Sequence, residues 1–103
     1  MQFQKIILIG SIISKPVIYK HDTDIKQDCM RFEISVSYIL KSEVVFPVVI
    51  FGPLAEMWEE QIAEGKLVLV EGRVDIDKKG KWRVFADWVQ TEEDMNKAEN
   101  NSK

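Results

Sequence analysis

The sequence has little of what disulfide frameworks, metal sites and membrane spans require. It contains one cysteine, Cys29, and one histidine, His21. A lone cysteine excludes an internal disulfide, and these two residues are too few for a common structural zinc site. No apolar run approaches the roughly 18 residues of a membrane span, and the first residues lack the pattern of a secretory signal. We therefore expect a cytoplasmic protein without a membrane partner, metal or other cofactor.

Signatures of catalysis are missing as well. His21 stands in the polar stretch 21–28, with no nucleophile or oriented carboxylate pattern near it. Cys29 directly precedes an apolar segment and is expected to be a small packed residue. The sequence contains no glycine-rich loop of the kind that cradles phosphate groups. We expect a protein that is not an enzyme and that takes no small-molecule substrate.

The charge balance argues at first against nucleic acid as a partner. The 103 residues suit a single domain and carry a formal net charge of −3, and an acidic protein repels phosphates. The acids are unevenly distributed, however. Residues 53–65 carry −4 and residues 91–103 carry −2, whereas the rest of the chain carries +3. The acidity is therefore confined to two segments, and what remains is mildly basic.

The first part of the chain predicts a bent strand followed by a loop. Residues 5–13 are rich in β-branched side chains and are interrupted by Gly10. A glycine inside a strand marks a bulge or a sharp bend. A short extended piece is expected at 17–19, and residues 21–28 are polar throughout. These segments predict one strand in two pieces, and then a loop.

The next two strands are predicted by alternation and by apolar density. From Met30 to Tyr38, apolar residues alternate with polar ones, which is typical of a strand with one buried face. Residues 44–51 form a dense apolar run that contains Pro47. Because proline lacks the N–H that a sheet requires, we expect an edge position or a bulge at this point.

One helix is predicted, over residues 53–64. Pro53 suits a first helical position, where an N–H would be unpaired anyway, and Gly65 suits a left-handed C-terminal cap. The apolar residues recur at helical spacing and form one stripe: Leu54, Met57, Trp58 and Ile62.

Two strands and a polar tail complete the chain. Residues 67–77 form a strand interrupted by Gly72, residues 78–81 a turn, and residues 82–90 the last strand. Residues 91–103 are polar and are expected to be disordered.

This order of elements predicts an all-β protein with one helix. It is the order of an OB-fold, a five-stranded Greek-key barrel with a helix between strands 3 and 4. An SH3-like barrel would lack the helix, and a ferredoxin-like fold would need a second helix, which residues 14–28 do not offer. We expect residues 1–90 to form the OB-fold domain and residues 91–103 to lie outside it.

Three blocks of sequence resemble a known family. They are Lys5 to Gly10 followed by Pro16, Val48 to Glu56, and Gly65 to Val74. Their order and spacing resemble the bacterial-type single-stranded DNA-binding proteins (SSB) over about residues 3–90. The resemblance implies an OB-fold, sequence-nonspecific binding of single-stranded DNA, and homo-oligomers, either dimers or tetramers. It also implies a role in DNA replication, recombination or repair, at a cytoplasmic, nucleoid-associated location.

The sequence departs from this family at functional positions. Tryptophans of the family are matched by Leu40, Val45 and Lys79, and only Phe51 keeps an expected aromatic residue. The acidic tip of the family, which ends in Pro-Phe, is absent, since the chain ends at 101–103 with Asn-Ser-Lys. These departures predict weaker, more salt-sensitive binding and an accessory or mobile-element protein.

The binding residues are expected on the last hairpin. Single-strand binding needs aromatic faces for bases and a positive groove for phosphates. Trp82 is the best stacking candidate, because it borders the densest basic cluster, and the resemblance adds Phe51, for which core packing is the alternative. The basic cluster, which a solvated turn would also explain, is Lys78, Lys79, Lys81 and Arg83.

The other candidates have stronger structural alternatives. Tyr38 continues the buried face of its strand, and Arg31 is as well explained by an ion pair as by a phosphate contact. Trp88 is expected in the core or an interface, and Phe46 at a subunit contact. The remaining candidates for stacking or phosphate contact are Lys5, Tyr19, Lys20 and Arg73.

Three functions are compatible with these residues. The favoured one is sequence-nonspecific binding of single-stranded DNA. The alternative is an OB-fold module for protein–protein interaction, such as an accessory or replisome-assembly factor, with weak or no DNA binding. An RNA-binding OB domain would use the same physics as the first.

Overall fold

The computed structural model describes residues 4–23, 26–37 and 42–92. Six strands and one helix follow one another in the predicted order, with the helix between the fourth and fifth strands. They are β1 (Ile6–Ile12), β2 (Val17–Tyr19), β3 (Cys29–Ser37), β4 (Glu43–Phe51), α1 (Gly52–Trp58), β5 (Leu67–Ile76) and β6 (Trp82–Thr91).

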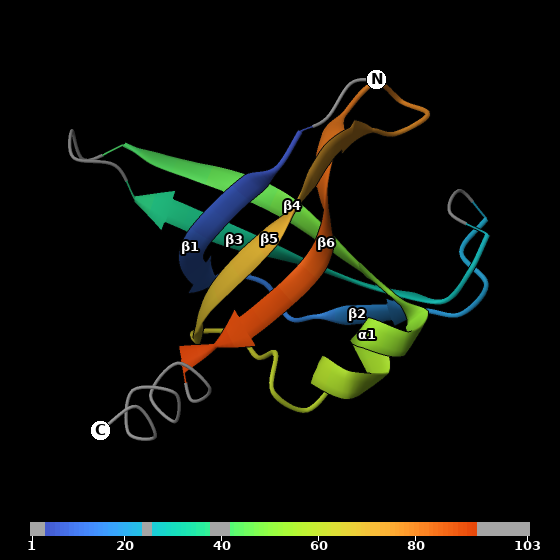
Figure 1. The fold of residues 1–103 in the computed structure, drawn as a ribbon, viewed down its shortest axis with the longest axis horizontal. Coiled ribbons are helices and arrows are strands. Elements are labelled where there is room, and N and C mark those ends of the chain that lie inside the picture. The colour runs from blue at the N-terminus through green and yellow to red at the C-terminus, as the bar shows by residue number, and fades with distance from the viewer. Residues whose placement is uncertain (1–3, 24–25, 38–41, 93–103) are drawn as a thin grey trace.

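Five of the strands close into a barrel (Figure 1). The sheet order is β1-β5-β6-β4-β3-β2, and an additional pairing between β1 and β3 completes the ring. All pairings are antiparallel except β4 with β6. β2 continues the path of β1 and pairs only with β3. This is the predicted OB-fold, with the bent first strand divided into β1 and β2.

Alternating side chains fill the barrel as the pattern of β3 predicts. Met30, Phe32 and Ile34 are buried, whereas Arg31 and Glu33 point away from the core. Inward residues of the other four barrel strands join the same apolar cluster. The outward residues of β3 and β4 are thereby left free to form a surface.

Gly10 and Pro47 have the roles that their residue types predict. A Cβ atom at Gly10 would collide with the carbonyl oxygen of Ser35, where β1 crosses from β5 to β3. Pro47 pairs with β3 on one side and precedes the stretch Val48–Ile50 that pairs with β6. It therefore lies at a locally open edge, where no N–H is needed.

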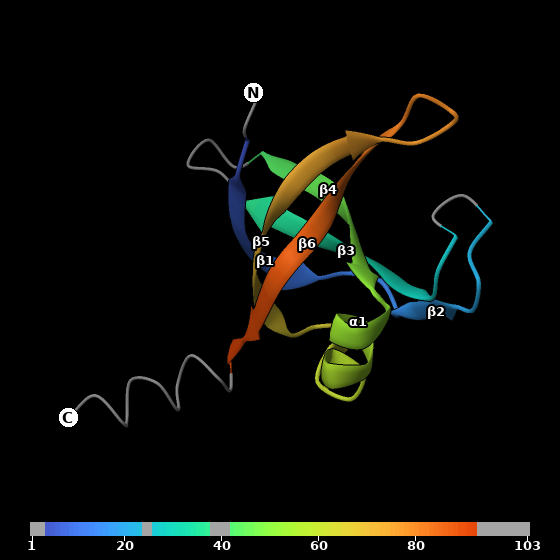
Figure 2. The ribbon, with the colours of Figure 1, turned by 45° about the vertical axis from the view of Figure 1, so that its right-hand side comes forward.

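The helix is shorter than the predicted span of 53–64. α1 ends at Trp58, and the chain then turns so that Ile62 packs in the core. Glu59 and Glu60 follow the negative end of this short helix and would oppose its extension. Gly65 has the expected positive φ of 89°, but in the turn that leads into β5. α1 lies at one end of the barrel and the β5–β6 hairpin extends from the other (Figure 2).

A bulge in β6 reverses which residues point inward. Gly72 pairs with Ala86 but Glu71 pairs with Trp88, so Asp87 has no partner across the ladder. Val84 and Ala86 are buried before the bulge, and Val89 and Thr91 are buried after it. A side chain at Gly72 would collide with the carbonyl oxygen of Phe85, and glycine is therefore required there.

The structure changes the expectation for two aromatic residues. Trp88 was expected in the core or an interface. The bulge turns it outward and its residue is 47% exposed, which excludes the core and leaves the interface open. Phe46 was expected at a subunit contact, but it is buried in the core. β6 also extends to Thr91, one residue beyond the predicted end. No helix in the described part of the chain has the length and apolar character needed to cross a bilayer.

Candidate nucleic-acid interface

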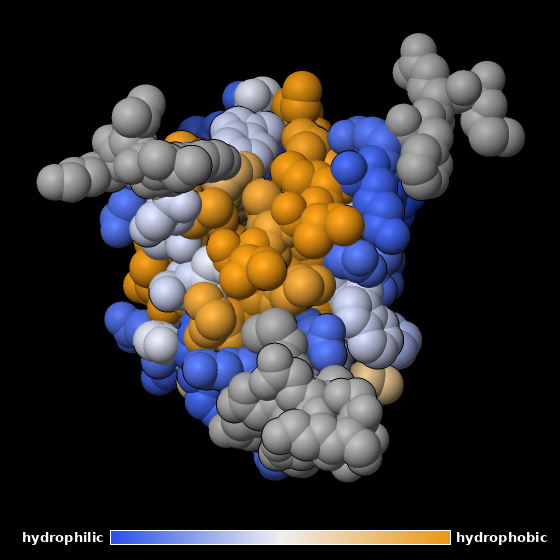
Figure 3. Space-filling view, turned by 60° about the vertical axis from the view of Figure 1, so that its left-hand side comes forward, coloured by the Kyte–Doolittle hydropathy of each residue, from blue (hydrophilic) through white to orange (hydrophobic). Residues whose placement is uncertain are grey.

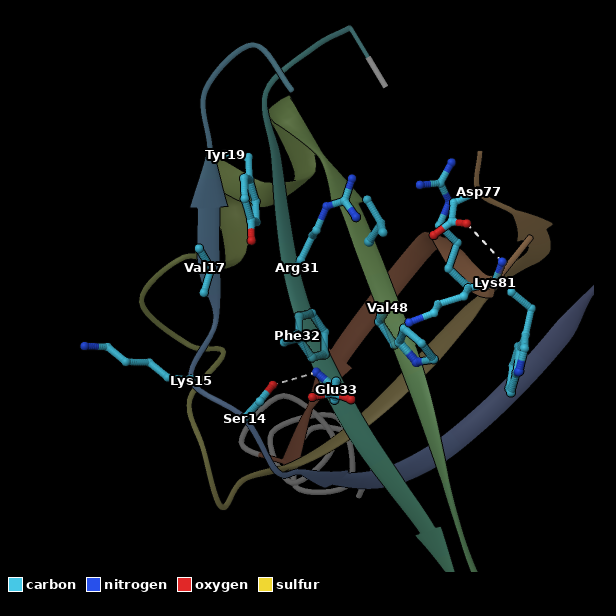
Figure 4. A pocket seen from close by; sticks show the side chains of 14 residues that line it. Ser14, Lys15, Val17, Tyr19, Arg31, Phe32, Glu33, Val48, Asp77 and Lys81 are labelled. Atoms are coloured by element: carbon cyan, nitrogen blue, oxygen red, sulfur yellow. Dashed lines mark hydrogen bonds between the residues drawn. The ribbon is translucent and has the colours of Figure 1, made fainter. Parts of the chain in front are cut away.

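A groove of about 340 Å³ crosses the outward side of β3 and β4. Figure 4 shows Tyr19 of β2 and Arg31 of β3 on one side of it, and Asp77 and Lys81 of the β5–β6 hairpin on the other. It is lined by Ser14, Lys15, Val17, Tyr19, Arg31, Phe32, Glu33, Pro47, Val48, Val49, Asp77, Lys81, Trp82 and Arg83. In OB-folds this face, between the first loop and the last hairpin, binds oligonucleotides.

On the β2 side of the groove an arginine lies between an aromatic ring and a carboxylate. Cζ of Arg31 lies 5.3 Å from the centroid of the Tyr19 ring, within the range of a cation–π contact. Nη2 of Arg31 lies 2.9 Å from Oδ2 of Asp22, which comes from the loop between β2 and β3. Arg31 was expected to pair either with a phosphate or with an acid, and here it has an acid as its partner.

On the β6 side a second arginine repeats this arrangement. Nη2 of Arg83 lies 3.1 Å from Oδ2 of Asp75, and Cζ of Arg83 lies 4.7 Å from the Phe85 ring centroid. The Arg83 side chain is largely buried. Arg31 and Arg83 thus each combine an aromatic neighbour with an aspartate partner.

A second hollow continues the groove along the sheet. It has a volume of about 380 Å³, and Phe51 and Phe85 form its aromatic wall, with ring centroids 4.9 Å apart. Arg73 also lines it and forms an ion pair with Asp87 at 3.4 Å. Strand register places one continuous row between the two hollows: Arg31, Val49, Phe85 and Arg73.

The β5–β6 hairpin presents its lysines on a closed turn. The Asp77 carboxylate accepts hydrogen bonds from the backbone N–H groups of Lys81 and Lys79, at 2.9 and 2.8 Å. These bonds, led by that from Lys81, lower the pKa of Asp77. Gly80 supplies the positive φ, 82°, that the turn needs. No described residue forms an ion pair with Lys78, Lys79 or Lys81.

Trp82 has both a structural contact and an exposed surface. Its ring packs edge-on against Phe46, with centroids 5.0 Å apart, and so covers the end of the core. The residue is still 40% exposed and lines the groove. Its role in base stacking stays a prediction, and the contact with Phe46 adds a role in packing.

The predicted site residues fall into separate groups. The groove gathers Tyr19, Arg31, Lys81, Trp82 and Arg83, and the second hollow gathers Phe51 and Arg73. Lys78 and Lys79 lie on the hairpin beside the groove. Lys5 and Lys20 line neither hollow, and they pair with Glu71 and Asp28, both at 3.7 Å. Tyr38 lies outside the described residues.

Sequence reasoning missed three participants. Phe85 was not chosen as a site residue. It lies two residues after Arg83 on the same strand and therefore on the same side of the sheet, which was a usable signal. Asp22 and Asp75 were also not chosen. Asp22 lies in a polar loop, and no local pattern connects it with Arg31 nine residues later.

Cys29 and His21, the residue types most often used for catalysis, do not line the groove. Burial raises the pKa of the Cys29 thiol, which favours its neutral, unreactive form. His21 is exposed, and its backbone N–H donates to Asp28, which lowers the pKa of that carboxyl group. Among residues 4–23, 26–37 and 42–92, no group of three or more histidine, cysteine or acidic side chains is placed to hold a metal ion.

Comparisons with known proteins identify a family and a shared fold. The profile of the single-strand binding protein family matches residues 3–92. No curated protein sequence matches the chain.

Several solved structures share the fold. The second single-stranded DNA-binding protein of Mycobacterium smegmatis has a TM-score of 0.73 at 20% identity, covering 85% of this chain and 87% of that one. The small single-stranded DNA-binding protein of Streptomyces coelicolor has a TM-score of 0.75 at 19% identity, covering 89% and 96%. The N-terminal domain of PriB from Thermoanaerobacter tencongensis, described as dimeric, has a TM-score of 0.69 at 17% identity, covering 84% and 93%.

Proposed function

The chain belongs to the single-strand binding protein family, and on that basis we propose that it binds single-stranded DNA without sequence preference through the groove on β3 and β4. The observation that carries the proposal is the composition of this groove. Tyr19 and Trp82 offer exposed ring surface in the groove, and Lys81, next to Trp82 in the chain, lines it as well. Aromatic faces beside basic side chains are what single-strand binding requires.

Bases and phosphates are assigned to different side chains. Bases stack on Tyr19 and Trp82 in the groove and on Phe51 in the second hollow, each contact contributing roughly 1–3 kcal/mol. Phosphates bind first at the hairpin lysines, because no described acid pairs with them. Stacking accepts every base, which explains the lack of sequence preference. Binding of this kind includes no chemical step, so the protein acts as a binding protein and not as an enzyme.

Single strands of DNA are exposed during replication, recombination and repair, and we place the protein in these processes. RNA presents the same base faces and phosphates. An RNA oligomer is therefore included in the test below, so that the preferred strand is measured.

A titration with labelled oligomers tests the proposal. Fluorescein-labelled dT oligomers, the matching duplex and an rU oligomer are titrated at two salt concentrations, and binding is read by anisotropy. We expect the single strand to bind more tightly than the duplex, and less tightly as the salt concentration rises. Failure of the dT oligomer to bind at low salt would overturn the proposal and favour the protein-interaction alternative.

A groove variant locates the site. Tyr19→Ala, at a residue that is 43% exposed, removes a ring that contacts Arg31, and we expect about a tenfold loss of affinity for dT, from one lost stacking interaction. Met57→Ala, which removes an exposed side chain of α1, is the matched control and is expected to bind like the wild type. Equal affinity of the Tyr19 variant and the wild type would place the DNA elsewhere.

We also propose that the protein self-associates through a second surface, the apolar face, defined by Ile7, Ile9, Leu69 and Trp88. Ile7 and Ile9 are each more than half exposed. Figure 3 shows apolar side chains gathered over the side of the barrel where β1 lies. An exposed patch of this kind on a single chain indicates an interface.

The adjoining strand edge makes a second copy the expected partner. β1 pairs with β5 from Ile6 to Ser11 but with β3 only at Ser11 and Ile12. The edge from Ile6 to Ile9 is therefore open among the described residues, and open edges pair readily with another strand. Two copies of β1 meeting antiparallel would cover both edges with a closed twofold contact and join the two apolar faces into one larger surface, which a second pair of chains could cover.

Mass measurement in solution tests self-association. Light scattering of the wild type is expected to give a multiple of the 12.0 kDa chain mass, with two or four chains. Ile9→Lys introduces a charge into the apolar face and should shift the mass to that of one chain. Met57→Lys alters an exposed apolar residue of α1 and is the control. A monomeric wild type at micromolar concentration contradicts the proposal.

A further inference from the structure

Arg31, one of the cations that line the groove, already has an anion bound to it. Oδ2 of Asp22 lies 2.9 Å from Nη2 of Arg31, and only 9% of the Asp22 side chain is exposed. The loop fixes this carboxylate in place. The N–H of Asp22 donates to the carbonyl of Gln27, and the N–H of Lys26 donates to the carbonyl of Asp22. The ion pair is therefore built into the loop between β2 and β3.

The carboxylate already uses part of the guanidinium that a DNA phosphate would use. A guanidinium binds carboxylate and phosphate oxygens in the same geometry and at similar distances. Arg31 lies in the row of side chains that connects the groove with the second hollow. A strand that follows this row brings its backbone to Arg31, where an anion is already present.

We propose that Asp22 is a built-in competitor for Arg31 and sets the affinity of the groove for single-stranded DNA. The inference rests on the proposed function, since it concerns the same groove. A phosphate that contacts Arg31 must either displace Asp22 from Nη2 or share the guanidinium with it, and in both cases the carboxylate lies beside the DNA. The lost Asp22 contact, or the repulsion between the two anions, offsets the gain. Arg31 therefore adds little net affinity and, with its charge already neutralised, releases no counterion.

Asp22 differs in this respect from the acid that pairs with Arg83. The side chain of Asp75 is 42% exposed, so water already screens that pair. Asp22 is the more deeply buried of the two acids, with 9% of its side chain exposed, and buried charges are screened less. Of the two acids, Asp22 is therefore the one whose charge should influence DNA affinity more.

Asp22→Asn tests the inference, because asparagine keeps the size of the side chain and the backbone bonds of the loop. The probe is a fluorescein-labelled dT oligomer, titrated over a series of salt concentrations. We expect binding to tighten about fivefold at low salt, as Arg31 becomes available to a phosphate. The plot of log K against log salt should become steeper by about 0.7, the value for one added phosphate contact on a single strand.

Two controls separate this effect from a change in overall charge. Glu60→Gln removes one negative charge from the exposed turn after α1, and its affinity and salt slope should remain at the wild-type values. In a double-mutant cycle, Asp22→Asn should give no gain when Arg31 is already replaced by Gln. A gain that persists in the Arg31→Gln background would show that Asp22 acts through general repulsion, and would overturn the proposal.

The remaining outcomes are equally decisive. A folded Asp22→Asn variant that binds dT no more tightly than a binding-competent wild type overturns this inference and leaves the proposed function intact. If the asparagine variant melts early, Asp22→Ser repeats the test. If both variants unfold, Asp22 is required for the structure of the loop, and the proposal is overturned. If the wild type does not bind dT, the proposed function itself fails.

Discussion

The barrel presents two outward surfaces that share a strand but differ in chemistry. The groove on β3 and β4 combines aromatic rings with arginines whose charges are paired with aspartates. The apolar face on β1, β5 and β6 exposes aliphatic side chains and one tryptophan beside an open strand edge. The first suits a flexible, charged ligand, and the second suits a rigid surface of the same kind as itself.

β6 contributes to both surfaces because of its bulge. Before Asp87, its outward residues, Arg83 and Phe85, belong to the groove and the second hollow. After Asp87, Trp88 points outward on the apolar face. One unpaired residue therefore separates the half of the strand that borders the groove and the second hollow from the half that borders the apolar face.

The largest expected effect comes from breaking the bulge. Gly72→Ala would force a Cβ against the carbonyl oxygen of Phe85, and we expect it to lower the free energy of unfolding by about 3 kcal/mol, the upper range for overpacking. Gly80→Ala is the control. It has no atom near its Cβ position and pays only for its positive φ, which costs about 1 kcal/mol. Urea titration of both variants measures the difference, and equal losses would contradict the steric explanation.

The second largest effect is expected in tryptophan fluorescence, which distinguishes the groove from the apolar face. Trp82 lines the groove, whereas Trp88 lies on the apolar face. Upon addition of dT, we expect Trp88→Phe to keep most of the quenching and Trp82→Phe to lose most of it, because a stacked base quenches only the ring that it touches. The reverse result would show that DNA binds the apolar face.

A smaller effect is expected on the salt dependence of DNA binding, which compares a lysine of the groove with a lysine outside it. Lys81→Ala removes a groove lysine, and we expect the slope of log K against log salt to fall by about 0.7. Lys5→Ala removes a cation that pairs with Glu71 and lies outside both hollows, so the slope should stay unchanged. A similar change in both variants would mean that binding responds to net charge and not to the groove.

Acid stability of the hairpin gives the smallest effect. Hydrogen bonds from the Lys81 and Lys79 N–H groups lower the pKa of Asp77 from its usual 3.8. A carboxyl group whose folded pKa is lowered stabilises the fold above its unfolded pKa, and this stability is lost as the pH falls through the folded value. We expect Asp77→Asn to reduce the melting temperature slightly at pH 6 and to match the wild type near pH 2. If the difference in melting temperature between the two proteins stayed constant with pH, ionisation of Asp77 would not be its cause.

Much of the fold was predictable because it depends on local patterns. Alternation from Met30 onward identified β3 and its buried face, and the glycine and proline positions marked the bend in β1 and the open edge of β4. The length of the helix was not predictable, because Ile62 leaves the helical path to reach a core assembled from distant strands. Helical spacing alone cannot show that a tertiary contact ends the helix early.

The site was predictable in part for the same reason. Aromatic and basic residues close together in sequence, such as Trp82 and Lys81, were found and do line the groove. Residues that act through partners on another segment were missed. Asp22 pairs with Arg31 across a loop, and Trp88 faces outward only because of a bulge that Gly72 on the neighbouring strand permits. Such relations depend on register, which a single sequence does not contain.

The bulge at Asp87 acts as a phase marker for the last strand. Asp87 is the extra residue, because Gly72 pairs with Ala86 and the next residue of β5, Glu71, pairs with Trp88. If Asp87 were deleted, Ala86 and Trp88 would become neighbours in a regular ladder, with Ala86 still inward and Trp88 still outward. Val89 and Thr91 would remain in the barrel. Loss of the Asp87 codon is therefore expected to be tolerated better than loss of the Val89 codon, which would turn Gln90 inward and Thr91 outward.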